Sequence, residues 1–201
     1  MEAVCHAGMV PAGGTIGAVR AVMLEVPQAL LDERRSKGLD RSDEMWEGEL
    51  HMVPPPSGEH QALGAELFLV LGPIAKARGL LPRYDPTGLF RPGVDDDWRV
   101  PDQQYARPEL ASKRGIEGAA SLVVEILLPH DETYRKFDWY ASVGVAEVLV
   151  IEPLTRGVEL FANQDGRMVP VEPVLIECLG VRAETADGKL RLAWEGGTAE
   201  I

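Results

Sequence analysis

Hydrophobic residues spaced three or four apart predict one long helix near the middle of the chain. The apolar positions are 63, 67, 70, 71 and 74, which fall on one side of a helix. Ser57 is a typical N-cap and Gly79 a typical end. Pro73 lies inside this pattern and predicts a kink or an early end. We therefore expect a helix from about residue 58, interrupted or shortened near Pro73.

A different pattern follows at residues 121–153. The segment "SLVVEIL" is almost continuously apolar and predicts a buried strand. A helix is predicted for "DETYRKFDWYASVG", which ends at Gly144, and a second strand for "AEVLVIEP". A strand, helix and strand of this length are typical of a parallel crossover unit.

Shorter elements surround these two. A short helix ends at Gly38, a hairpin turns at Glu47–Gly48, and a second hairpin turns at residues 164–167. Single strands are predicted for residues 98–106 and 189–195. Residues 83–97 have turn-forming composition and are expected to be a loop or the tip of a hairpin, and residues 108–120 are expected to be a connecting loop.

The fold class predicted from these elements is α/β or α+β. One mixed sheet would have a long helix before it and a second helix inside the crossover. With 201 residues the chain is expected to form a single domain over residues 21–201. Residues 1–20, rich in glycine and alanine, are expected to be a flexible arm.

Composition is that of an ordinary globular protein, with 45% hydrophobic and 26% charged residues. No apolar stretch approaches the roughly 18 residues of a membrane span, and the N-terminus lacks the features of a secretory signal. We therefore expect a cytoplasmic protein without a membrane partner. Cys5 and Cys178 stand alone and indicate neither a disulfide framework nor a zinc site.

Net charge is −12, which argues against non-specific attraction to a phosphate backbone. The charge is unevenly distributed, because residues 76–136 contain ten basic and ten acidic residues. The middle of the chain is therefore neutral, and the objection to an anionic substrate is weaker there.

Glu125 is a single carboxylate in the apolar strand segment. Alternation places it on one face with Val123 and Leu127. A buried carboxylate is costly unless a cation or hydrogen-bond donors meet it. An architectural ion pair, or exposure of this face, would explain Glu125 equally well on this observation alone.

Two other residues suggest a chemical role for Glu125. Asp102 follows a proline at a predicted strand, and Lys136 lies on the following helix, on the same face as Tyr140. Two carboxylates can hold one hard divalent cation such as Mg²⁺ or Mn²⁺, and a nearby lysine can bind a phosphate. Metal-assisted hydrolysis of a phosphodiester needs these groups, although the spacing alone is a common one.

The order of the motifs is more specific. The series "VPD" at residues 100–102, "LVVEIL" at 122–127, Lys136 with Tyr140, and "EVLVIEP" resembles the Uma-type "putative restriction endonuclease" family of the PD-(D/E)xK nuclease superfamily. The upstream segments "DEMWEGEL" and "PPSGEH" resemble the corresponding segments of that family, so the likeness extends from about residue 30 to about residue 173. It implies a mixed sheet of four or five strands flanked by helices, one Mg²⁺-type site, and nuclease chemistry.

The resemblance also implies roles for individual residues. Asp102, Glu125 and Lys136 match the family's aspartate, glutamate and lysine, and Glu44 matches a glutamate that adds a carboxylate to the metal site. The supporting positions are His60, which we interpret as a structural histidine, and Glu132 and Tyr140 around the lysine.

The chain departs from the family pattern at two places. Leu128 replaces a residue with a hydroxyl group after Glu125, and Gln103 and Gln104 replace apolar residues after Asp102. The glutamines make burial of that strand uncertain, and neither departure removes a proposed metal or phosphate ligand.

Other conspicuous residues have plainer interpretations. Tyr134, Phe137, Trp139 and Tyr140 are expected in the core, with Trp139 the most exposed of them. The run of aspartates at residues 95–97 is expected to be a solvated turn.

The favoured function is a metal-dependent endonuclease acting on DNA, expected by resemblance to be a homodimer. Two alternatives stay open: an inactive module that keeps the fold for binding or assembly, and a hydrolase of a small phosphorylated ligand. No separate DNA-reading motif is present, so the sequence predicts no base specificity.

Overall fold

The computed structural model describes residues 25–53, 55–84, 86–128 and 132–201. The arm expected for residues 1–20 lies outside this part of the chain. Within it, the strands form three sheets of six, five and four strands.

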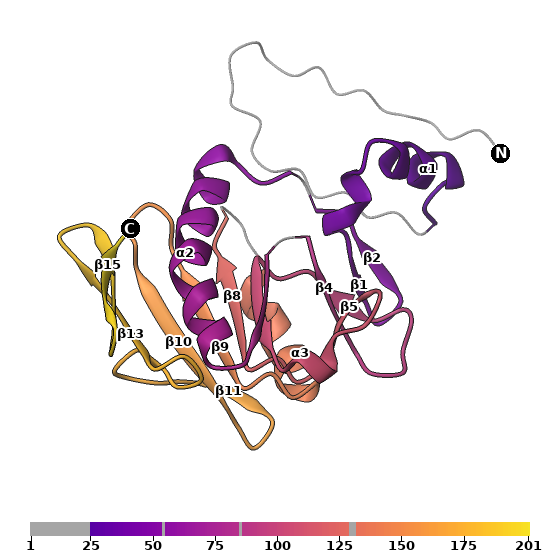
Figure 1. The fold of residues 1–201 in the computed structure, drawn as a ribbon. Coiled ribbons are helices and arrows are strands. Elements are labelled where there is room, and N and C mark those ends of the chain that lie inside the picture. Colours follow the sequence, from indigo (N-terminus) through magenta and orange to yellow (C-terminus); the bar gives the residue numbers. More distant parts are fainter. Residues whose placement is uncertain (1–24, 54, 85, 129–131) are drawn as a thin grey trace, which may run out of the picture.

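The six-stranded sheet lies at the centre of the molecule (Figure 1). Its order is β11-β10-β9-β8-β6-β3, and only the pair β8 and β9 is parallel. The strands are β3 (Leu81–Tyr84), β6 (Gln103–Ala106), β8 (Leu122–Ile126), β9 (Glu147–Ile151), β10 (Val158–Gln164) and β11 (Arg167–Pro170). The predicted parallel crossover and the predicted hairpin at residues 164–167 are therefore confirmed, and the sheet is wider than the four or five strands implied by the resemblance.

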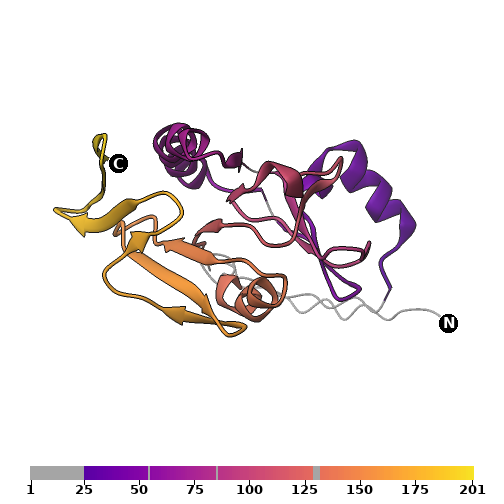
Figure 2. The ribbon, with the colours of Figure 1, turned by 60° about the horizontal axis from the view of Figure 1, so that its bottom comes forward.

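Helices cover both faces of this sheet, as Figure 2 shows. One face packs against α2 (Gly58–Ala77), and the other against the 3₁₀ turn η3 (Thr133–Lys136) and α3 (Phe137–Ser142), which continues from it. Alternation along β8 sends Leu122, Val124 and Ile126 into the first core and Val123 into the second. The mixed α+β class predicted from the sequence is confirmed.

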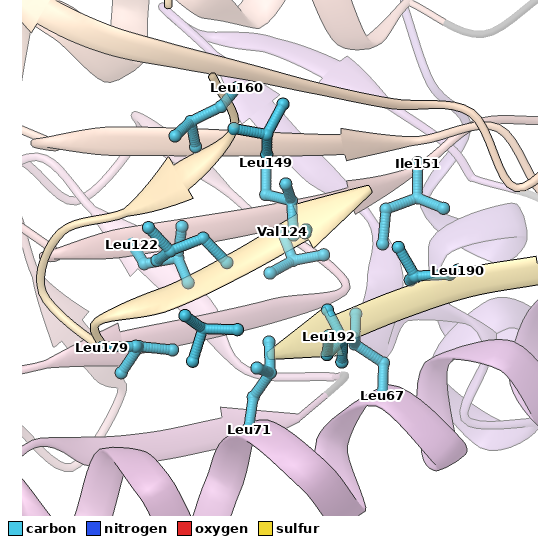
Figure 3. Close-up of a cluster of buried hydrophobic side chains, with 14 of the residues drawn as sticks. Leu67, Leu71, Leu122, Val124, Leu149, Ile151, Leu160, Leu179, Leu190 and Leu192 are labelled. Atoms are coloured by element: carbon cyan, nitrogen blue, oxygen red, sulfur yellow. The ribbon is translucent and has the colours of Figure 1, made fainter. Parts of the chain in front are cut away.

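Figure 3 shows the first core, where Leu67 and Leu71 of α2 point toward Val124 and the neighbouring strands. Leu190 and Leu192 enter the same core from the four-stranded sheet. That sheet contains β12 (Leu175–Ile176), β13 (Val181–Ala186), β14 (Lys189–Trp194) and β15 (Gly197–Glu200). The sequence predicted only the strand that became β14; β12 has two residues and β15 four, whereas β13 alternates between buried and exposed residues and was missed.

Helix α2 begins and ends as its sequence predicts, except at Pro73. Ser57 accepts a hydrogen bond from the His60 amide at 3.2 Å, and Gly79 adopts a left-handed conformation after the last turn. The expected early end at Pro73 is wrong, because the helix continues to Ala77. Pro73 lies on the exposed side, so the carbonyl of Leu69 that it leaves without a partner faces solvent and the cost is reduced.

The five-stranded sheet contains the predicted hairpin and three strands that were not predicted as such. Its strands are β1 (Glu44–Trp46), β2 (Glu49–His51), β4 (Gly88–Phe90), β5 (Trp98–Arg99) and β7 (Gly115–Glu117). Strand β4 pairs with β5 and forms the hairpin that was the alternative to a loop at residues 83–97. Strand β7 lies in a segment expected to be a loop, because three residues are too few to show a period of two. The helix α1 (Gln28–Ser36) precedes this sheet and ends before Gly38, as predicted.

Residues 98–106 form two strands rather than the single predicted strand. β5 joins the five-stranded sheet and β6 joins the central sheet, and Pro101 and Asp102 lie between them. Proline has no N–H for a ladder hydrogen bond, so the chain changes sheets there. Asp102 consequently lies where the two sheets meet. In the described part of the chain, no helix is long and apolar enough to cross a membrane.

Candidate active site

Glu125 lies on β8, on the face that packs against η3 and α3. Its side chain is buried, with 4% of the residue exposed. Burial raises the pKa of Glu125 to about 8, the charge of Lys136 lowers it, and the charges of Asp102 and Glu44 raise it further. Three carboxylates therefore influence one another around one buried strand position.

Lys136 and Tyr140 approach Glu125 from the helix. Because they are four residues apart they share a face, and both contact the same oxygen of Glu125. The Lys136 Nζ lies 3.2 Å from Glu125 Oε1, and the Tyr140 hydroxyl donates a short hydrogen bond to that atom. Burial and the neighbouring carboxylates raise the pKa of Tyr140, so its hydroxyl keeps its proton and stays a donor.

Glu44 holds Lys136 from the other side. Its Oε1 lies 2.9 Å from Lys136 Nζ and accepts a hydrogen bond from the Val100 amide at 2.9 Å. Its Oε2 accepts a hydrogen bond from Trp46 Nε1 at 2.7 Å. Because protein donors reach both oxygens, the geometry favours a role in positioning Lys136. Direct metal binding by Glu44 stays a prediction.

Asp102 lies at the junction of the two sheets, next to the carboxyl end of β8. Its Oδ2 accepts a hydrogen bond from the Ile126 amide at 2.6 Å, and His60 Nε2 lies 3.3 Å from the same oxygen. The Asp102 side chain is 18% exposed, compared with 5% for Glu125. Asp102 is therefore the more accessible of these two carboxylates.

His60 comes from the first turn of α2 and is 5% exposed. Its Nε2 lies 3.0 Å from the carbonyl oxygen of Ile126 and 3.3 Å from Asp102 Oδ2. A protonated Nε2 would bridge the two oxygens and fix the loop that carries Asp102 against β8. This geometry agrees with the structural interpretation of His60, whose role stays a prediction.

Glu132 lies beside the cluster rather than within its central contacts. It forms an ion pair with Arg135, and its Oε2 lies 3.6 Å from Nδ1 of His51. Leu128, the position that departs from the family pattern, follows the same strand. Supporting roles for Glu132 and Tyr140 remain predictions, and Tyr140 is the one that touches Glu125.

Oxygen donors gathered here fit a hard divalent cation. Asp102 and Glu125 are carboxylates, and the Ile126 carbonyl lies near the same His60 nitrogen as Asp102 Oδ2. Mg²⁺ and Mn²⁺ prefer such oxygen ligands and keep several water molecules. Among the described residues, no group of three or more His, Cys, Asp or Glu side chains is close enough to hold a metal. A cation bound by Asp102 and Glu125 would therefore take its remaining ligands from main-chain or water oxygens.

The two glutamines after Asp102 are buried and hydrogen-bonded rather than disruptive. The Gln103 side-chain nitrogen donates to the Gly64 carbonyl at 2.9 Å, and that of Gln104 donates to the Thr87 carbonyl at 2.6 Å. Both residues are at most 1% exposed. Strand β6 is therefore buried despite them.

Sequence reasoning missed the buried charges next to this cluster. Asp97 is 3% exposed and pairs with Arg91 at 2.5 Å and Arg99 at 3.0 Å, whereas Asp95 and Asp96 are exposed as expected. Trp139 donates to Asp97 at 2.8 Å and is buried, so its expected exposure is wrong.

Tyr134 is the exposed aromatic of that helix, at 48%. The spacing of Asp97 and Arg99, two apart on one strand face, was the available signal for the buried pair.

Comparison with known proteins gives one family and one related structure. Residues 33–188 match the Uma2 family model, described as "Putative restriction endonuclease". A "putative nuclease belonging to DUF820" from Anabaena variabilis ATCC 29413 is 19% identical, with a TM-score of 0.52. The match covers 66% of this chain and 78% of that chain, and at this identity it shows the fold alone. No curated protein matches the chain.

Proposed function

The chain belongs to the Uma2 family, and from this premise we propose that it is a divalent-metal-dependent endonuclease that hydrolyses phosphodiester bonds in DNA. The observation that supports the proposal is the convergence of Asp102, Glu125 and Lys136 at one end of β8. Burial and the charge of Asp102 raise the pKa of Glu125, and strongly perturbed groups of this kind are a feature of functional sites.

Asp102 and Glu125 would hold Mg²⁺ or Mn²⁺, which would polarise the phosphate and lower the pKa of a bound water. Ionised Glu125 needs a cation there, because burial and its acidic neighbours otherwise favour the protonated carboxyl. Tyr140 fixes the orientation of Glu125 through its hydrogen bond. Asp102 is fixed in the same way by the Ile126 amide.

Lys136 is the group that would stabilise negative charge on the phosphate in the transition state. Its ammonium is held between Glu44 and Glu125, so it needs little reorganisation during the reaction. Glu44 in turn is fixed by the Val100 amide and by Trp46. This network makes Glu44 a positioning residue in the proposal, with metal binding through water as its additional role.

Cleavage by the wild-type protein with Mg²⁺ or Mn²⁺ on mixed DNA substrates tests the proposal directly. We expect Asp102→Asn and Glu125→Gln each to lower the cleavage rate by roughly 10²-fold or more, the scale for losing one oriented charged group. Glu109→Gln is the matched control, since Glu109 is exposed and its substitution removes the same charge. An inactive wild type, or full activity in both site variants, would contradict the proposal.

Two alternatives have specific support. The net charge of −12 and the lack of a three-residue metal group in the described chain favour an inactive binding or assembly module. Calorimetry with Mg²⁺ distinguishes this module from a metal-dependent nuclease, because the module would show no Mg²⁺ binding that depends on both Asp102 and Glu125.

A hydrolase of a small phosphorylated ligand would instead cleave a nucleotide or phosphoester and leave DNA intact. The homodimer is likewise a proposal, to be tested by analytical ultracentrifugation at several concentrations.

A further inference from the structure

A polar pocket of about 530 Å³ lies beside the candidate active site. The helix that carries Lys136 and Tyr140 separates the two. Lys136 and Tyr140 contact Glu125, while Arg135 and Trp139, each one position earlier, line the pocket. Trp46 of β1 also lines it and donates to Glu44 at 2.7 Å. The pocket and the site therefore share one supporting network.

Arg99 is a buried guanidinium in the lining of this pocket. It is 3% exposed and lies between two indole rings, 4.6 Å from the Trp46 centroid and 4.4 Å from the Trp139 centroid. Stacking on both faces leaves only the edges of the guanidinium for hydrogen bonds. The side chain is thus held rigidly with its edges pointing in fixed directions.

The three nitrogens of the Arg99 guanidinium differ in their hydrogen bonds to the described residues. The hydrogen bonds of Arg99 to described residues leave from Nη1, toward Met45 O, Asp97 Oδ1 and Trp98 O at 2.7, 3.0 and 3.1 Å. Its Nε is buried and has no partner in the described part of the chain. That Nε is closed off from solvent, whereas Nη2 donates to no described residue and is the donor that an oxyanion in the pocket can reach.

Charges around the pocket limit the size of that oxyanion. The lining contains the exposed Arg135, Arg91 paired with Asp97, and three exposed carboxylates, Glu47, Glu49 and Asp138. These acids would repel the further phosphates of a duplex lying across the mouth. A single phosphate that enters deeply would reach Arg99 and leave the acids outside.

We propose that this pocket binds one phosphate group of a nucleic-acid strand, through Nη2 of Arg99 and the guanidinium of Arg135. The identity of the ligand rests on the proposed nuclease function, whereas its binding needs neither a metal nor cleavage. The phosphate belongs either to a strand end or to an internal diester, and both present oxygens that a guanidinium edge can bind.

Binding is measured with the full chain in EDTA, by titrating inorganic phosphate, the dinucleotide TpT and its 5′-phosphorylated form pTpT. Trp46 and Trp139 flank Arg99, so their fluorescence should change on binding. We expect Arg99→Lys to weaken phosphate binding roughly tenfold or more, since lysine keeps the charge but loses the planar guanidinium that the two indoles orient.

Two exposed variants keep the test valid if Arg99→Lys does not fold. Arg135→Gln should weaken binding and Asp138→Asn should strengthen it, each by roughly threefold. Arg107→Gln is the matched control, because Arg107 is exposed, does not line the pocket and removes the same charge as Arg135→Gln.

Tighter binding of pTpT than of TpT assigns the pocket to strand ends, and equal binding assigns it to internal diesters. The proposal is overturned if no probe binds at about 10 mM, or if Arg135→Gln and Asp138→Asn both behave like the control. DNA cleavage without phosphate binding in the pocket would reject this inference alone. Phosphate binding without cleavage would reject the nuclease function alone.

Discussion

The two faces of strand β8 differ in what they contribute. On the face toward α2, Leu122, Val124 and Ile126 are at most 1% exposed and belong to a mainly apolar core, whose buried Gln103 is hydrogen-bonded to Gly64 and Tyr105. On the face toward α3, Glu125 replaces an apolar residue and is met by Lys136 and Tyr140. The same five residues therefore build a hydrophobic core on one side and a charged cluster on the other.

This difference shows how the fold tolerates a costly group. Burial of the apolar face stabilises the sheet by about 25 cal/mol per Å² of apolar surface. On the other face, the desolvation of Glu125 raises its pKa to about 8 and opposes folding at neutral pH. The apolar face therefore provides the stability that offsets the cost of burying Glu125 on the other face.

The largest expected effect comes from moving the charge to the other face. Val124→Asp places a carboxylate in a mainly apolar core, and should reduce the free energy of unfolding by about 4 kcal/mol or more. Glu125→Val should leave a folded protein, because Lys136 keeps its contact with Glu44 at 2.9 Å. Urea denaturation followed by circular dichroism measures both. Equal losses in the two variants would contradict the comparison.

The next effect separates stability from activity. Leu67→Ala, in the α2 core, should cost about 2–5 kcal/mol of stability and leave the cleavage rate per folded molecule unchanged. Glu125→Gln should show the reverse, with nearly wild-type stability and little cleavage. Thermal unfolding paired with single-turnover cleavage measures both quantities. A Leu67→Ala protein that is stable but inactive would show that the two faces are not independent.

The pH dependence of stability should reveal the raised pKa of Glu125. Its pKa is about 8 in the folded state, against 4.5 for an unperturbed glutamate. Its stabilising contribution is therefore fully present below about pH 4.5 and is lost as the pH rises toward 8. In EDTA, the free energy of unfolding should fall more between pH 5 and pH 8 in the wild type than in Glu125→Gln. Parallel pH profiles of the two proteins would refute the raised pKa.

The smallest expected effect concerns the support of Lys136. Trp46→Phe keeps an aromatic ring and removes the 2.7 Å hydrogen bond to Glu44, which is worth about 0.5–1.5 kcal/mol. We expect a cleavage rate reduced about threefold to tenfold. Trp194→Phe, in the four-stranded sheet, is the matched control. An unchanged rate in Trp46→Phe would mean that Glu44 does not need this donor.

Much of the fold could be predicted from local pattern. The helix capped by Ser57, the crossover around Glu125 and the hairpin at Glu47–Gly48 each have a clear period or turn signal, and each was observed. The short strand β7 and the strand break at Pro101 were missed, and β4 was anticipated only as one side of a possible hairpin. Elements of three residues have no measurable period, and their existence depends on partners that are distant in sequence.

The candidate site could be predicted in part. Lys136 and Tyr140 are four apart on a helix, which is enough to place them on one face beside Glu125. The burial of Asp97 and Trp139 and the stacking of Arg99 were not predicted. Each depends on contacts between β5, the β1–β2 hairpin and α3, which no local spacing reveals.

By itself, the sequence determined that β8 has one carboxylate in an apolar row and that a lysine follows on the next helix, because alternation and helical spacing are properties of the local backbone. Only the tertiary structure decided that Glu44 forms an ion pair with Lys136, that Asp102 lies at the junction of two sheets, and that Arg99 lies between two tryptophans. Those contacts join residues far apart in the chain, and their energy comes from burial and charge, which exist only after the sheets and helices have packed.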